Sequence, residues 1–304
     1  MSEIKKDERA GTLERGRAET ISSPARGEVR RGGSNVSLTP FSLAGRISAL
    51  ARRQAVPSRI SSGDLEVVFF CDTTGSMYPY FARVRDSIVA IAKRIAQEQV
   101  RAQFAVYAYK NHGDEAQHFH GVYPFLHQPL TADPEMIRKT LAEVRPGGGG
   151  DGLCAVEDAF HHLNAQARSV VGGKAKRVGV VVGDMPPHGV LDRVSGCPHE
   201  YDYRAEVADL AKKGFAFYSV FCSQESERTS PRKQKIQDYY QWLAREHGGK
   251  YLELAELDAL VDVLLGICMK ETGRLDSFIA QVGKQMALPA TTRRLLLQLK
   301  APDK

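Results

Sequence analysis

Short apolar runs that alternate with amphipathic helical segments are the feature that most limits how this chain can fold. Residues 65–71 read LEVVFFC, which is typical of a strand buried on both faces of a parallel sheet. Similar runs occur at 104–109, 177–184, 215–222 and 250–254. Between them, apolar residues recur at helical spacing, most clearly over 78–98. The alternation predicts an α/β fold with a doubly wound, Rossmann-like sheet of about six strands and helices on both faces.

One short strand should run against the others. The segment at 118–125 has the composition of a strand and follows the run at 104–109 after only eight residues. A parallel connection needs roughly a dozen residues or more, usually a helix. The sheet is therefore expected to be mostly parallel, with one short antiparallel strand.

The chain divides into three predicted parts. Residues 1–60 are rich in Arg, Glu, Gly and Ser without a sustained apolar period, which predicts disorder, although 42–53 could form a short basic helix. Residues 61–274 contain the alternating segments and are expected to form the domain. Residues 275–304 are expected to form a helical tail, either packed on the domain or free to bind a partner as a peptide.

Charge and hydropathy narrow the function classes. The net charge is +6, and residues 1–60 hold the whole excess because they contain 12 Lys and Arg against 6 Asp and Glu. A basic tail gives weak, salt-sensitive binding to anionic polymers at most, so no specific nucleic-acid partner is expected. No run reaches the roughly 18–20 apolar residues that span a bilayer, and the N-terminus lacks the apolar core of a secretory signal. The expected location is therefore cytoplasmic.

Three loops at the expected sheet edge carry oxygen-rich side chains. In a doubly wound sheet, ligands bind at the carboxyl ends of the strands where the winding reverses. Hydroxyl and carboxylate oxygens suit Mg²⁺, and Mn²⁺ could take its place. The predicted metal ligands are Asp72, Thr74, Ser76, Asp151 and Asp184.

These loops resemble those of a known family. The heptapeptide CDTTGSM at 71–77 is similar to the DxSxS signature of the metal-ion-dependent adhesion site in von Willebrand factor A domains, with Thr74 at the middle serine. The resemblance covers roughly residues 64–272 and is closest to the A domains associated with alpha-kinases. Three further motifs carry it in the same order: Tyr109–Asp114, a GGGD loop at 148–151, and Asp184 followed by Pro187-His188-Gly189.

The resemblance implies different roles for the predicted ligands. Thr74 and Ser76 would bind the metal directly through their hydroxyls, while Asp72 and Asp184 would act mainly through water. Asp151 lies where many adhesion domains have a threonine, and Gly152-Leu153-Cys154 replaces the x-Pro-Glu of the kinase-linked relatives. Three ionised aspartates would outweigh the charge of the cation. That should strengthen metal binding and weaken the attraction for an acidic residue of a partner.

The expected function is an intracellular, metal-dependent protein–protein interaction module, a scaffold or adaptor in a signalling or stress-response complex. Its partner would be a protein that offers an acidic or polar residue to the metal. The chain contains no glycine-rich kinase loop and no HRD-like motif, so a kinase would be a separate chain. We therefore expect a binding protein rather than an enzyme.

The alternative function is a Mg²⁺-dependent α/β hydrolase of the phosphatase type that uses Asp72. Haloacid dehalogenase-type phosphohydrolases need DxD at the first strand, with the first aspartate as nucleophile. Here Thr74 stands two residues after Asp72, so the second carboxylate is absent. Two simpler interpretations are that Asp72–Ser76 only caps a helix, and that Gly147–Gly150 cradles a phosphate, which Asp151 would repel.

A zinc site is a further alternative. His188, Cys197 and His199 lie close together in the sequence, but their irregular segment offers no clear fourth ligand. His188 is instead expected to support Asp184. The five cysteines are scattered and never spaced CxxC, so reduced thiols in or near the core are expected.

Overall fold

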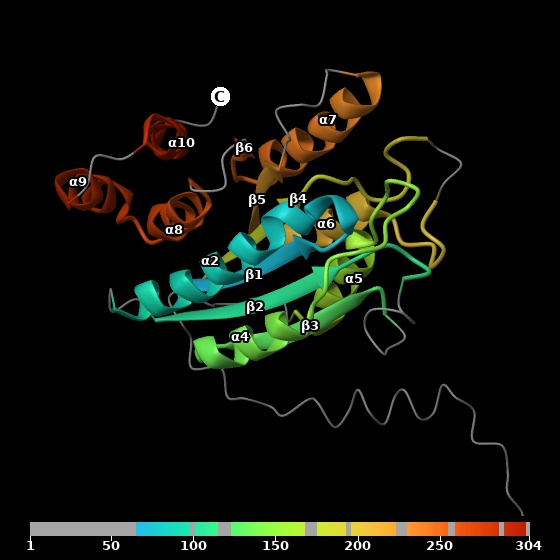
Figure 1. Ribbon diagram of the computed structural model, residues 1–304, viewed down its shortest axis with the longest axis horizontal. Helices are drawn as coiled ribbons and strands as arrows, with labels where there is room; N and C mark the ends of the chain where they lie inside the picture. The colour runs from blue at the N-terminus through green and yellow to red at the C-terminus, as the bar shows by residue number, and fades with distance from the viewer. Residues whose placement is uncertain are drawn as a thin grey trace, which may run out of the picture. The chain divides into compact units, whose positions relative to one another are not determined.

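The described part of the chain is built on a six-stranded sheet. The computed structural model describes residues 65–97, 101–114, 123–167, 175–192, 196–222, 230–254, 259–285 and 289–301. Residues 1–64, with the helix predicted over 42–53, lie outside the described residues. Within the described ranges the strand order is β3-β2-β1-β4-β5-β6 (Figure 1).

The sheet is mostly parallel, as the sequence predicts. β1 pairs in parallel with β2 and β4, and β5 pairs in parallel with β4 and β6. Only the β2–β3 pair of this sheet is antiparallel. The strands are β1 (Leu65–Asp72), β2 (Ala102–Tyr109), β3 (Phe125–Thr131), β4 (Lys176–Gly183), β5 (Phe215–Cys222) and β6 (Tyr251–Leu254).

Helices cover both faces of the sheet (Figure 1). On one face, the buried side chains of α2, α4 and α8 pack with Val67 and Phe69 of β1. On the other face, α5, α6 and α7 pack with Val68 and Phe70. The helices are α2 (Tyr78–Gln97), α4 (Pro134–Glu143), α5 (Val156–Gln166), α6 (Tyr203–Lys212), α7 (Pro231–Arg245), α8 (Leu260–Glu271), α9 (Leu275–Gln285) and α10 (Ala290–Lys300). The fold class predicted from the sequence is therefore confirmed.

Aromatic packing under α5 anchors the central strand. The ring of Phe70 stacks on Tyr107 with centroids 5.2 Å apart and meets Phe160 edge-on at 4.9 Å. Full burial of one such side chain stabilises a fold by about 1.5–3 kcal/mol. Because β1 is buried on both faces, its carboxyl end is held firmly beneath the loops that follow it.

The antiparallel strand lies later in the chain than the sequence analysis places it. β3 begins at Phe125, whereas the expected segment at 118–125 lies mostly outside the described residues. β3 reads FLHQPLT and is partly exposed, because it is the edge of the sheet. An edge strand tolerates Pro129 and polar residues, since one side of it has no neighbouring strand to receive its hydrogen bonds. The strand therefore lacks the apolar run that marks its neighbours.

The C-terminal segment packs on the domain. Leu296 and Leu299 of α10 lie against Gly266 of α8, where an added Cβ would meet them at 2.5 and 3.1 Å. Both leucines are buried in the same apolar cluster as α2 and α8. Of the two roles left open for this segment, packing on the domain is the one observed. No helix among the described residues is both long and apolar enough to cross a membrane.

The winding of the sheet reverses at β1. The chain passes from β1 to β2 on one side and later returns to β4 on the other side of β1. Such a reversal leaves a crevice outside the carboxyl ends of the two strands, because the connections from them diverge to opposite faces. The loops after β1 and β4 therefore meet at the edge where a doubly wound fold binds its ligands.

Candidate metal centre

The first loop of the site begins where β1 ends. Asp72 is the last residue of β1 and is fully buried, and a short 3₁₀ turn, η1 (Gly75–Met77), precedes α2. Asp72 Oδ1 accepts hydrogen bonds from the backbone N–H of Thr74 at 2.8 Å and from its hydroxyl at 2.7 Å. Bonds of this kind from the second residue along the chain stabilise a tight turn. The turn brings the hydroxyl of Thr74 back onto the carboxylate of Asp72.

Polar groups continue from this turn to β4. Thr74 Oγ1 and Ser76 Oγ lie 3.3 Å apart, and Ser76 Oγ donates to Asp184 Oδ1 at 2.8 Å. Asp184 directly follows β4, and β1 and β4 are parallel neighbours whose carboxyl ends lie side by side. The structure therefore brings four of the five predicted residues, Asp72 included, into one row of contacting side chains.

Asp151, the fifth predicted residue, has other hydrogen-bond partners. Its Oδ1 accepts from Asn111 Nδ2 at 2.6 Å and from the backbone N–H of Leu153 at 3.1 Å. The residue is exposed, unlike Asp72. Among the hydrogen bonds of the described residues, none joins Asp151 directly to the other four. It lies at the border of the site rather than within the row of contacting side chains.

The glycine run before Asp151 lies against the first loop. The backbone N–H of Gly147 donates to Thr73 O at 3.0 Å. Gly149 has a φ of +73°, and a Cβ at this position would lie 2.8 Å from the Cβ of Thr74. Glycine is therefore required both by the backbone conformation and by the closeness of the two loops. The glycine run therefore allows its own loop to pack closely against the loop after β1.

A buried lysine, to which the sequence pattern assigned no separate role, joins these loops. Lys110 follows β2 and is fully buried, and its Nζ donates to the carbonyl oxygens of Thr73, Arg145 and Gly147 at 2.7, 2.8 and 2.7 Å. Burial lowers the pKa of Lys110 to about 8, although Asp114 and Asp72 act in the opposite direction. Three carbonyl acceptors explain a charged side chain here, because an apolar one would remove a donor from each, although Thr73 O would keep the N–H of Gly147.

Burial dominates the electrostatics of Asp72. It raises the pKa of Asp72 to about 6, while the hydrogen bonds from Thr74 and from the backbone of Met185, and the charge of Lys110, offset only part of this effect. The second carboxylate oxygen, Oδ2, is buried and has no hydrogen-bond partner among the described residues. A buried, unpartnered carboxylate oxygen costs free energy. A cation bound beside it would offset that cost.

The donor set fits a hard divalent cation. The side chains of Asp72, Thr74, Ser76 and Asp184 offer hydroxyl and carboxylate oxygens. Mg²⁺ prefers oxygen ligands in octahedral geometry and keeps several of its waters. Asp72, Thr74, Ser76 and Asp184 are the residues that could hold it, with Asp151 at the border.

Comparisons with known proteins bear on the fold alone. No protein-family model matches the sequence, and no curated protein matches it significantly. Among solved structures, the pilus adhesin SpaC from Lactobacillus rhamnosus GG in its open conformation is similar, with a TM-score of 0.51 and 12% sequence identity. A second crystal structure of this adhesin gives a TM-score of 0.49 and 11% identity.

The similarity to the adhesin is partial. It covers 72% of this chain and 31% of the adhesin in both structures. The chain thus corresponds to about a third of the length of that protein. At 12% identity, the similarity to the open conformation of the adhesin supports a shared α/β fold.

Proposed function

We propose that this chain binds Mg²⁺ at the carboxyl ends of β1 and β4 and uses the site to bind a protein partner, in the manner of a von Willebrand factor A domain. The observation that carries the proposal is the fully buried carboxylate of Asp72, whose Oδ1 contacts the hydroxyl of Thr74 next to that of Ser76 and whose Oδ2 has no side-chain or backbone donor within hydrogen-bond geometry among the described residues. The order of the motifs, which resembles that family, supports the same conclusion. Binding rather than catalysis is the proposed activity.

Each residue has a role that follows from its chemistry. The hydroxyls of Thr74 and Ser76 are neutral oxygens that can bind a cation while keeping their hydrogen bonds to Asp72 and Asp184. The carboxylates of Asp72 and Asp184 supply negative charge from opposite ends of the row of contacting side chains. Lys110 and the glycine run hold the loops in place. When bound, the cation would supply a positive charge that attracts an oxygen of the partner.

Replacing Ser76 with Ala should abolish stabilisation by Mg²⁺ without unfolding the chain. A ligand that binds only the folded state at about 100 times its Kd raises stability by about 2.7 kcal/mol. We expect the melting temperature of the full chain to rise when EDTA is replaced by Mg²⁺ or Mn²⁺, and this rise to vanish in Ser76→Ala. Ser277→Ala, an exposed serine of α9, is the matched control and should respond like the wild type.

Two outcomes would count against the metal site. A wild-type melting temperature that is the same in EDTA and in Mg²⁺ would remove the metal from the proposal. An equal rise in Ser76→Ala and wild type would mean that Mg²⁺ binds elsewhere. In either case the fold would stand, because the sheet and its helices do not depend on the cation.

Replacing Asp151 with Thr should alter metal and partner binding in opposite directions. The change removes one negative charge from the border of the site, so the affinity for Mg²⁺ should fall, by about tenfold if about 1.4 kcal/mol is lost. A less neutralised cation should attract an acidic partner residue more strongly. Calorimetric titration measures the first effect, and retention of a partner in Mg²⁺ but not in EDTA measures the second. Unchanged binding of both would show that Asp151 has no electrostatic role here.

A further inference from the structure

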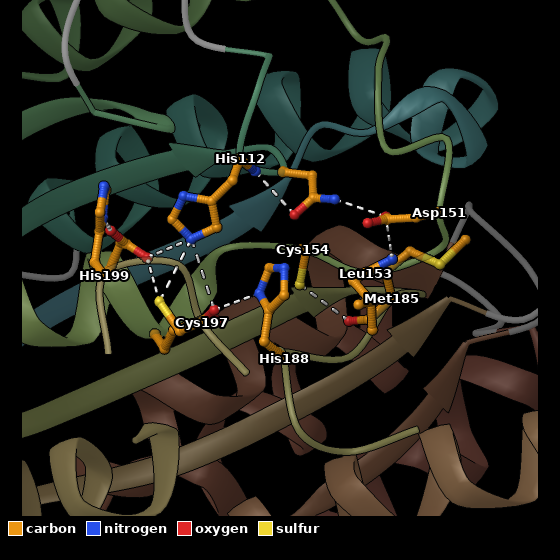
Figure 2. A network of polar contacts seen from close by, with 11 residues as sticks. His112, Asp151, Leu153, Cys154, Met185, His188, Cys197 and His199 are labelled. Carbon is orange, nitrogen blue, oxygen red and sulfur yellow. Dashed lines mark hydrogen bonds and ion pairs between the residues drawn. The ribbon is translucent and has the colours of Figure 1, made fainter. Parts of the chain in front are cut away.

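A second group of side chains lies on the same loops and outside the Mg²⁺ site. We call it the His–Cys cluster: His112, Glu157, Asp158 and Cys197. His112 follows β2, the two acids lie in the first turn of α5, and Cys197 lies between β4 and α6. Figure 2 shows the side chains of His112 and Cys197 turned toward one another, with His188 and His199 at the sides. The proposed function uses none of the four cluster residues.

The donor atoms of the cluster have the spacing of ligands around one small ion. His112 Nε2 lies 3.0 Å from Asp158 Oδ2, 3.5 Å from Cys197 Sγ and 3.9 Å from Glu157 Oε1. Cys197 Sγ lies 3.5 Å from Asp158 Oδ2. Around a tetrahedral ion with bonds of about 2.0 Å to nitrogen or oxygen and about 2.3 Å to sulfur, neighbouring ligand atoms stand about 3.3–3.6 Å apart.

The arrangement differs from a catalytic thiol with its base. In such a triad the thiol contacts one ring nitrogen of the histidine and the orienting acid contacts the other. Here the thiol and both acids approach the same nitrogen, Nε2 of His112. Four donors that converge on one point are the pattern of a cation site.

Burial of the acids is the second observation that points to a cation. Glu157 is 0% exposed and Asp158 is 3% exposed, although they are adjacent carboxylates. Glu157 Oε2 is buried and has no hydrogen-bond partner among the described residues. Buried carboxylates are rarely stable unless a positive charge pairs with them or a metal binds them. A divalent ion would neutralise both at once.

Two further histidines hold the acids in position. His188 Nδ1 lies 2.5 Å from Glu157 Oε1, and His199 Nδ1 lies 2.5 Å from Asp158 Oδ1. Groups bonded behind metal ligands fix their orientation and are part of a metal site. His188, Cys197 and His199 had been set aside as zinc ligands because no fourth ligand follows them in the sequence. The fold supplies the missing donors from the loop after β2 and from α5.

We propose that the His–Cys cluster binds one Zn²⁺ ion, independently of the Mg²⁺ site. A thiolate and an imidazole select zinc over Mg²⁺ and Ca²⁺, which prefer oxygen. Two of the donors are on α5, His112 is in the loop after β2, and Cys197 is on the segment between β4 and α6. Zinc therefore joins the segment at 196–202 to the N-terminus of α5 and restrains the loop that carries Asp184.

The test is zinc binding by the full chain in excess Mg²⁺, which keeps the first site occupied. We expect one equivalent of Zn²⁺ per chain, measured by elemental analysis after gel filtration. Co²⁺ should replace it and give a thiolate-to-cobalt charge-transfer band with the visible bands of a tetrahedral ion. Cys197→Ser should remove that band. It should also weaken zinc binding by more than the roughly 10–100-fold that loss of an outer hydrogen-bond partner costs.

Further variants separate ligands from supporting groups and from the first site. His112→Gln should weaken zinc binding like Cys197→Ser, while His199→Gln should weaken it by only about tenfold. His161→Gln is the matched control, because His161 lies on α5 but bonds Glu206 outside the cluster. Ser76→Ala should lose the response to Mg²⁺ and keep equimolar zinc. The two proposals can therefore fail separately.

The thiols give a readout that does not depend on spectra. Cys197 is partly exposed, whereas the other four cysteines are buried, so a thiol reagent should modify Cys197 first in the native chain. Equimolar Zn²⁺ should protect it, and EDTA should restore its reactivity. The proposal is overturned if folded wild-type chain binds no equimolar zinc, or if Cys197→Ser and His112→Gln both bind it as wild type does. Cobalt binding without a thiolate band would overturn it too.

Discussion

Replacing Lys110 with Met should destabilise the folded chain by about 2–4 kcal/mol and abolish Mg²⁺ binding. Lys110 Nζ is the hydrogen-bond donor to the carbonyls of Arg145 and Gly147 and to that of Thr73. Methionine fills a similar volume but donates no hydrogen bond. A buried acceptor left without its donor costs about 1–3 kcal/mol. The loss also weakens the attachment of the glycine run to the first loop, on which the proposed metal site depends, and leaves it to backbone hydrogen bonds such as that from Gly147 N–H to Thr73 O.

Lys212→Met is the matched control for this variant. Lys212 is an exposed lysine of α6 that pairs with Asp209 at 2.8 Å. Exposed ion pairs of this kind contribute little, so this change should alter stability by less than about 1 kcal/mol. Denaturant unfolding in EDTA measures both variants. If Lys110→Met is as stable as the control, the three hydrogen bonds do not hold the loops as described.

Replacing Asp72 with Asn should stabilise the chain in EDTA and abolish its stabilisation by Mg²⁺. Burial raises the pKa of Asp72 from its ordinary value of 3.8 to about 6, so the ionised carboxylate destabilises the metal-free fold at neutral pH. One pKa unit corresponds to about 1.4 kcal/mol, and asparagine removes the charge while keeping an oxygen acceptor for Thr74. We expect a gain of about 2–3 kcal/mol at pH 7.5.

The pH dependence of that gain provides a check on its sign. The pKa of Asp72 is higher in the folded state than in the unfolded state. The protonated carboxyl group of Asp72 therefore favours the folded state at low pH. This contribution to stability is lost as the pH rises through about 6. The advantage of Asp72→Asn over wild type in EDTA should be full at pH 7.5 and fall to about half at pH 5. An advantage that grows on acidification would contradict this account.

Asp86→Asn is the control for Asp72→Asn, because Asp86 is an exposed acid on α2. It should change stability by less than about 0.5 kcal/mol and leave the response to Mg²⁺ intact. The Asp72 variant also tests the alternative function. Hydrolysis of a phosphate ester by wild type that is lost in Asp72→Asn would favour the phosphohydrolase hypothesis over a binding module.

The strands were easier to predict than the loops between them. The runs at β1, β4 and β5 are apolar because both of their faces are buried, and this requirement is visible residue by residue. β3 has no such requirement, since it lies at the edge, and its position was wrong. α5 begins only at Val156, after Cys154, which forms a bridge with Pro187.

The predicted Mg²⁺ residues could be found because of where they lie in the chain. Asp72 and Asp184 directly follow β1 and β4, and parallel strands place their carboxyl ends at one edge. Topology therefore brings them together without any detail of side-chain packing. Asp151 follows no strand. Its carboxylate accepts hydrogen bonds from Asn111 and from the backbone N–H of Leu153 and lies apart from the other predicted metal ligands.

The sequence by itself determined the α/β class, the winding of the sheet and the edge at which Asp72 and Asp184 lie. These properties depend on local periodicity and on the lengths of connections, which any stretch of residues displays directly. Only the tertiary structure decided the partners of Lys110 and the composition of the His–Cys cluster. His112 and Cys197 are 85 positions apart, in loops without periodicity. Whether such residues meet depends on how the whole sheet orders its strands, because loop residues follow the strands that carry them.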